Sequence, residues 1–288
     1  MKLAVLRGPR KVNRSAAGNF FLFAFLAVAG AFSAIPLVYA INAAFKPLDE
    51  IFLFPPRMFV RNPTLQNFAD LVNLLGQSWV PFTRYIFNTV FITLVGVIGH
   101  VLFASMAGYA LAKHNFPGRR VLFQIVVLSL MFAWQVTAVP NYMIMAKLGL
   151  VDTYWAVILP AFAYSLGLYL MKQFMEQIPD ALLEAAKIDG ASEYRIFWSV
   201  VMPNVKPAWM TLIILLFQFL WGTDGNGFIY SEQLKTLHYA SNQIIQGGIA
   251  RAGAASAVAL ILMSVPITIF IFSQSQIIET MATSGMKD

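Results

Sequence analysis

The 288-residue sequence has no cysteine and few charged residues. The lack of cysteine excludes disulfides, thiol catalysis and metal sites built on Cys. Asp, Glu, Lys and Arg form only 11% of the chain, against about 25% in a typical soluble domain. The three histidines, His100, His114 and His238, fit no common metal-ligand spacing. No GxxxxGK[ST] phosphate loop occurs, so this chain is not expected to be an ATPase.

Apolar residues dominate what is present. They make up 59% of the chain, and a surface of this kind needs lipid around it. The length fits one membrane domain. The net charge of +7 could indicate nucleic acid. Basic residues at the cytoplasmic edge of a membrane give the same excess, so no nucleic-acid partner is expected.

Six charge-free stretches are long enough to cross a bilayer, which takes about 20 residues. The prediction is an all-α polytopic membrane protein with a basic arm over 1–18 and one transmembrane domain over 19–288. The expected spans are about 19–45, 85–112, 121–146, 153–171, 207–223 and 252–278. A secondary carrier usually needs a buried carboxylate, so charge-free spans weigh against that class.

Basic residues set the expected orientation. With both termini in the cytoplasm, 13 of the 20 Lys and Arg residues fall on that side. Segments 46–84 and 224–251 would then be external. Thr64 precedes an apolar pattern and predicts the start of a short surface helix, in a segment that is either a folded cap or a landing surface for an external partner. The run from Asp224 to Gly227 indicates turns, and it lacks the further carboxylates of an EF-hand calcium site.

The cytoplasmic segment 179–207 predicts two helices joined at a glycine. Asp180 suits the first turn of one helix, and Ser192 suits the N-cap of a second helix running to about Met202. Gly190 can adopt the left-handed conformation that ends the first helix. Pro203 and Pro207 are expected to stop the second helix before the fifth span. An interfacial hairpin without a partner and a docking elbow both fit this pattern.

The same segment resembles the EAA loop of permease subunits of bacterial ATP-binding-cassette (ABC) importers. Glu184-Ala185-Ala186 is followed after three residues by Gly190, and after nine more by Val200-Val201-Met202-Pro203. This is the family spacing, with Met202 where leucine is usual. Other segments resemble the carbohydrate branch of the family, of the smaller maltose-permease type. They include Phe45-Lys46-Pro47, Asn88-Thr89, Phe116-Pro117-Gly118-Arg119, Thr153-Tyr154 and Ile178-Pro179.

The resemblance implies a type I ABC importer permease fold in the bacterial cytoplasmic (inner) membrane. It implies a second homologous permease, two ATPase subunits that bind ATP and Mg, and an extracytoplasmic sugar-binding protein. This chain would hold no cofactor and no metal, and would not be an enzyme. The residues implied to couple it to the ATPase are Glu184, Ala185, Ala186, Asp189, Gly190, Ala191 and Pro203.

Aromatic and amide side chains in the spans suit the flat faces and hydroxyls of sugars. The expected pathway residues are Trp134, Gln135, Asn141, Tyr142, Tyr164, Gln218 and Trp221. Each is also a common packing or interfacial residue. The function expected is therefore a permease subunit for sugar or oligosaccharide import. The alternatives are import of amino acids, peptides or ions by the same family, or a secondary carrier.

Overall fold

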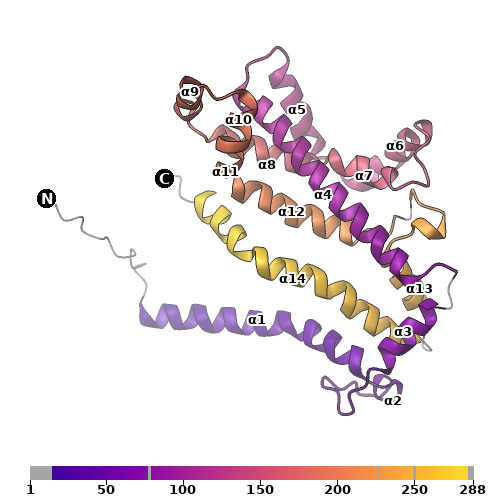
Figure 1. Cartoon of the computed structure of the whole chain (residues 1–288). Coiled ribbons are helices and arrows are strands. Elements are labelled where there is room, and N and C mark those ends of the chain that lie inside the picture. Colours follow the sequence, from indigo (N-terminus) through magenta and orange to yellow (C-terminus); the bar gives the residue numbers. More distant parts are fainter. Residues whose placement is uncertain (1–14, 77–78, 226, 249–250, 285–288) are drawn as a thin grey trace.

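The computed structural model describes residues 15–76, 79–225, 227–248 and 251–284 (Figure 1). Every regular element in these ranges is helical, as predicted. Most of the predicted basic arm and Asn226 lie outside the described residues.

The helices follow one another with short connections. In chain order they are α1 (Ala16–Phe45), α2 (Leu48–Ile51), α3 (Gln66–Gly76), α4 (Phe82–Lys113), α5 (Arg119–Ser129), α6 (Trp134–Lys147), α7 (Trp155–Phe162), α8 (Ser165–Glu176), α9 (Asp180–Ile188), α10 (Glu193–Ile196), the π-helix η1 (Phe197–Val201), α11 (Met202–Asn204), α12 (Lys206–Trp221), the 3₁₀ helix η2 (Glu232–Leu234), α13 (Leu237–Gln246) and α14 (Ala252–Ser284).

Four helices in the described residues are long and apolar enough to cross a membrane, and six spans result if two bent pairs each count as one. The four are α1, α4, α14 and the α7–α8 unit. The predicted span 121–146 is instead the pair α5 and α6, bent by 114°. The bend lies between Ser129 and Trp134, whereas Pro140 is inside α6.

The predicted span 153–171 also differs in the structure. It is interrupted between Phe162 and Ser165, and α8 continues to Glu176. The sequence predicted a span free of charged residues, whereas the longer span in the structure carries Lys172 near its end. Lys172 Nζ lies 2.6 Å from Glu176 Oε2 and 4.2 Å from the centre of the Phe123 ring.

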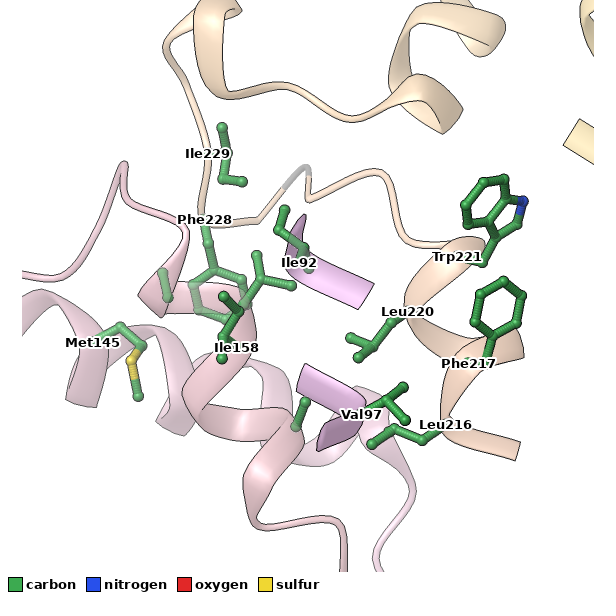
Figure 2. Close-up of a cluster of buried hydrophobic side chains, with 13 residues drawn as sticks. Ile92, Val97, Met145, Ile158, Leu216, Phe217, Leu220, Trp221, Phe228 and Ile229 are labelled. Atoms are coloured by element: carbon green, nitrogen blue, oxygen red, sulfur yellow. The ribbon is translucent and has the colours of Figure 1, made fainter. Parts of the chain in front are cut away.

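Close packing around α4 organises the bundle. A cluster joins α4, α7 and α12 through Ile92, Ile158 and Leu220 (Figure 2). At Gly108 an added Cβ would lie 3.0 Å from Met171 Cβ and 3.2 Å from the backbone nitrogen of Lys172. Helix α8 therefore approaches the backbone of α4 closely. A small residue in α4 thus permits close helix contact.

Helix α1 stands apart from this bundle. Its C-terminal part contacts α14 and α3, and its N-terminal half diverges from α14 (Figure 1). None of its apolar 18-residue window is buried within the chain. Its surroundings are therefore lipid or another subunit.

The predicted surface helix is α3. The Gln66 amide donates to Thr64 Oγ1 at 3.0 Å, which supports the start of the helix. Phe68 and Leu71 face the packed side, where they join a cluster with α13 and α14. Leu65 and Val72, from the same predicted apolar pattern, are exposed.

Candidate functional site

The elbow, residues 179–207, forms from local signals. Helix α9 starts at Asp180 after Pro179, and Gly190 follows it with φ of 79°, the left-handed conformation predicted for this glycine. The Ser192 hydroxyl then accepts from the Arg195 amide at 3.4 Å and caps α10. The helix–glycine–helix arrangement is thus as predicted.

The two faces of the elbow differ. The inner face places Leu183, Ile196 and Phe197 against Met175 and Ile178 in a buried cluster. The outer face exposes the predicted coupling residues Glu184, Ala185, Asp189 and Gly190, while Ala186 and Ala191 are half-buried. Two large apolar side chains share this exposed side: Ile188 is 86% exposed and Tyr194 is 75% exposed. The elbow is therefore packed against the rest of the chain on its inner face and exposed on its outer face.

The second half of the elbow does not end at Met202. The π-helix η1 follows α10, and α11 continues to Asn204, so Pro203 lies within the helix rather than beyond it. Proline lacks the N–H that would donate there, and it follows a π-helical turn, in which the regular α-helical bonding pattern is already interrupted. The chain then bends by 77° into α12, and Trp209 Nε1 donates to the Met202 carbonyl at 3.1 Å across the bend.

Two polar contacts join the elbow to the end of α4. Lys113 Nζ lies 2.7 Å from Asp180 Oδ1, at the first residue of α9. Tyr109 Oη donates to Glu193 Oε2 at 2.9 Å, at the first residue of α10. Lys187 Nζ also reaches Glu193 Oε1, at 2.6 Å. Both helices of the elbow are therefore fastened at their first residues to the same turn of α4.

The sequence analysis placed Asp180 in the first turn of its helix, but it did not predict the contacts of these residues with α4. The available signal was an acidic residue in the first turn of each elbow helix, together with Lys113 in the last turn of a span. The hydrogen bond and the positive charge of Lys113 lower the pKa of Asp180, so this carboxylate is charged at neutral pH.

The predicted pathway residues do not form one group. Trp134, Gln135, Asn141 and Tyr142 all belong to α6. Tyr164, at the break between α7 and α8, stacks on Phe219, which follows the exposed Gln218. Trp221 belongs to the buried core cluster (Figure 2). Its indole N–H donates to the Leu262 carbonyl at 3.1 Å. Its position favours the packing role over the pathway role.

A polar strap crosses the opposite end of the bundle from the elbow. Residues 228–235 contact the α6–α7 connection on one side, where the Tyr230 and Ser231 amides each donate to Asp152 Oδ1 at 2.8 Å. On the other side Asn88 Nδ2, in α4, donates to the Gln233 and Lys235 carbonyls at 2.8 Å. The strap thereby links α4 to the α6–α7 connection.

Asp152 carries much of this link. It has φ of 62°, which aspartate tolerates better than most residues. Partial burial opposes its ionisation, but the Ser231 hydroxyl, the Ser231 and Tyr230 amides and the charge of Lys235 outweigh it and lower the pKa of Asp152. The charged carboxylate is therefore the form that the strap binds. Among the described residues, no three His, Asp or Glu side chains gather as a metal site would require.

Comparison with known proteins gives consistent matches. Residues 100–281 match the family model described as binding-protein-dependent transport system inner membrane component. The arabinooligosaccharides transport system permease protein AraQ of Halalkalibacterium halodurans is 36% identical over 199 residues, which are 67% of each chain. The sn-glycerol-3-phosphate transport system permease protein UgpE of Yersinia enterocolitica is 30% identical over 187 residues, 65% of this chain and 66% of that one.

A solved structure has the same fold. It is the crystal structure of a bacterial ABC transporter involved in the import of the acidic polysaccharide alginate. One of its chains superposes with a TM-score of 0.78 at 20% identity, over 92% of this chain and 99% of that chain.

Proposed function

Because this chain belongs to the family of binding-protein-dependent transport system inner membrane components, we propose that it is a permease subunit of a sugar or oligosaccharide ABC importer. It is a multi-pass membrane subunit of a transporter rather than an enzyme. The observation that carries the coupling role is the elbow, because its inner face is packed and fastened while its outer face is open.

The ATPase contact is assigned to the outer face of the elbow. Glu184 and Asp189 supply charge, and Gly190 supplies the turn. Small side chains keep the surface flat; they are those of Ala185, Ala186 and Ala191. Pro203 lies in the helix that leads to α12. A groove on an ATPase subunit could accept this surface, with one elbow per subunit. ATP and Mg would be bound by those ATPase subunits, and this chain would transmit their movement.

The remaining partners are proposed by analogy with the type I fold. A second homologous permease would form the other half of the pathway, and an extracytoplasmic binding protein would deliver the cargo. Both termini and the elbow would face the cytoplasm of the bacterial inner membrane, which the distribution of Lys and Arg supports. Six spans result when each of the two bent pairs counts as one.

A sugar cargo is supported by AraQ, whose name states arabinooligosaccharide transport. In this chain, Trp134, Gln135, Asn141 and Tyr142 of α6 and the pair Tyr164 and Gln218 would line the route. The name of UgpE states sn-glycerol-3-phosphate transport, so a small phosphorylated polyol is the second candidate cargo. Uptake measured with both classes of compound separates these two.

The coupling role is tested in the reconstituted importer by Gly190→Pro and, separately, Glu184→Lys. Cargo-stimulated ATP hydrolysis should collapse while the permease still inserts. A milder pair is Gly190→Ala and Gly118→Ala. Both glycines have positive φ, 79° and 87°, with no atom within 4 Å of an added Cβ, so each change adds a similar backbone strain of roughly 1–2 kcal/mol.

Only Gly190→Ala should change the ratio of ATP hydrolysed to cargo imported, because Gly118 lies in the α4–α5 turn outside the elbow. Normal hydrolysis and uptake in Gly190→Pro would mean that the elbow is only an interfacial hairpin.

A further inference from the structure

The segment after α1 has an inverted distribution of polarity. Its charged and amide side chains point inward: Lys46, Glu50 and Asn67 are only 2%, 5% and 2% exposed. Glu50 accepts from the Arg61 and Asn62 amides at 3.2 Å. Lys46 donates to the Arg57 carbonyl, and Asn67 Nδ2 donates to the Ala44 carbonyl at 2.9 Å. These bonds satisfy the buried polar groups without water.

The apolar side chains of the same segment point outward. Phe54 is 93% exposed, Phe59 is 68% exposed and Phe52 is 50% exposed. Leu53 and Met58 are exposed as well. We name residues 52–59 the apolar loop. A loop bathed in water normally has the opposite arrangement, with its polar groups outside. The loop is therefore built for surroundings that are less polar than water.

The position of the loop identifies those surroundings. The Val60 amide donates to Asn42 Oδ1 at 3.2 Å, and Asn42 belongs to the last turn of α1. The chain has thus turned back alongside the span it has just left. Lys46 Nζ also lies 5.0 Å from the centre of the Tyr39 ring, further back along α1. The loop consequently lies at the depth of the end of α1, beside its exposed apolar surface.

We propose that the apolar loop inserts into the bilayer leaflet at the C-terminal end of α1, as an interfacial anchor. Aromatic side chains favour the boundary between headgroups and acyl chains. Arg57, within the loop, and Arg61, just after it, are both exposed, so their charges can meet lipid phosphates. A water-soluble partner has little access to a surface that turns back beside a span.

Because this chain has no cysteine, the surroundings of the loop can be measured with a label on a single introduced cysteine. Single-cysteine variants Phe54→Cys and Phe59→Cys, each carrying a nitroxide label, are placed with the complete importer in nanodiscs of phosphatidylethanolamine and phosphatidylglycerol. Asp49→Cys is the matched control, because Asp49 is an exposed polar residue of the same segment. Collision rates are measured with oxygen, which concentrates in the bilayer, and with a water-soluble nickel complex.

Labels at 54 and 59 should collide mainly with oxygen, and the label at 49 mainly with nickel. Nickel-dominated collisions at 54 and 59 would overturn the proposal, since the loop would then lie in water. Protection from both reagents, or a change in label mobility when binding protein is added, would also overturn it in favour of a protein contact. The inference needs only that α1 crosses the bilayer. ATP hydrolysis measured on the same labelled importer tests the proposed function separately.

Discussion

Lys113 Nζ, in the last residue of α4, lies 2.7 Å from Asp180 Oδ1, in the first residue of α9. The lysine side chain is 7% exposed and the aspartate is 77% exposed. The ammonium is thus held in place by its surroundings, and it also reaches the Ile178 carbonyl. This contact and the bond from Tyr109 to Glu193 make α4 the anchor of both elbow helices, so a push on the elbow should be passed to α4.

Reversing the Lys113–Asp180 pair should test this anchor. Lys113→Asp and Asp180→Lys place like charges together, and each should lower cargo uptake more than ATP hydrolysis, because the elbow then moves without α4. The double variant restores opposite charges and should recover much of the uptake. Uptake and hydrolysis are measured together in proteoliposomes. Equal losses in all three variants would indicate general misfolding and contradict the anchoring role.

Tyr109→Phe removes one hydroxyl from the second contact and keeps the ring. The lost bond to the Glu193 carboxylate should destabilise the subunit by about 1 kcal/mol. This is below the roughly 1.5–3 kcal/mol of a bond to a charged group, because Glu193 is half-exposed. The ratio of uptake to hydrolysis should fall, whereas Tyr194→Phe, on the outer face, should leave the attachment to α4 intact. A Tyr109→Phe importer with unchanged thermal unfolding and coupling would show that this bond is dispensable.

Gly167→Ala should disturb the contact between α4 and α8. The added Cβ would overlap the His100 imidazole, with Cε1 only 2.6 Å away. His100 is itself held by its Nδ1 contact of 3.1 Å with the Phe162 carbonyl, so it cannot move freely. Overpacking of this kind costs about 1–3 kcal/mol. Thermal unfolding of the purified subunit measures it.

Two comparisons make the Gly167 result specific. Gly30→Ala should be tolerated, because nothing lies within 4 Å of its added Cβ. In a His100→Ala background, Gly167→Ala should cost much less, because the overlapping ring is gone. Strictly additive losses in the double variant would refute the proposed overlap.

Asp152→Asn should weaken the strap in a pH-dependent way. The pKa of Asp152 is lowered in the folded state, so its contribution to stability is complete above the unfolded pKa of about 3.8 and is lost as pH falls through the lower folded pKa. At pH 7 the variant should be less stable by about 1 kcal/mol or less, given the partial exposure of the carboxylate. The difference in thermal unfolding should shrink between pH 5 and pH 3. A stability difference that stays constant with pH would show that the charge of Asp152 does not stabilise the strap.

Local signals predicted the elbow well. Asp180, Gly190 and Ser192 each act within a few residues, through the helix dipole, the left-handed turn and the N-cap. Pro203 was misjudged because a π-helical turn precedes it and brings it into the first turn of α11. Such turns have no simple sequence signature.

The spans were predicted by composition, which carries no information on direction. Residues 130–133 include Leu130, Met131 and Phe132 and are apolar, so the 114° bend between α5 and α6 was invisible to hydropathy. The anchoring and strap contacts were missed for another reason. Tyr109 and Glu193 are 84 residues apart, and Asn88 and Lys235 are 147 apart, so only the folded chain brings them together.

The segment that follows α1 has a consequence for the order in which the protein is made. Its bonds join residues separated by only 11 to 23 positions, as between Glu50 and Arg61 or between Ala44 and Asn67. These bonds can therefore form while the ribosome is still translating α4, because local contacts form early. The strap must wait until residues 228–235 have been synthesised. The bonds at the end of the first span can thus form long before the bundle exists, and the contact of α1 with α14 is added later.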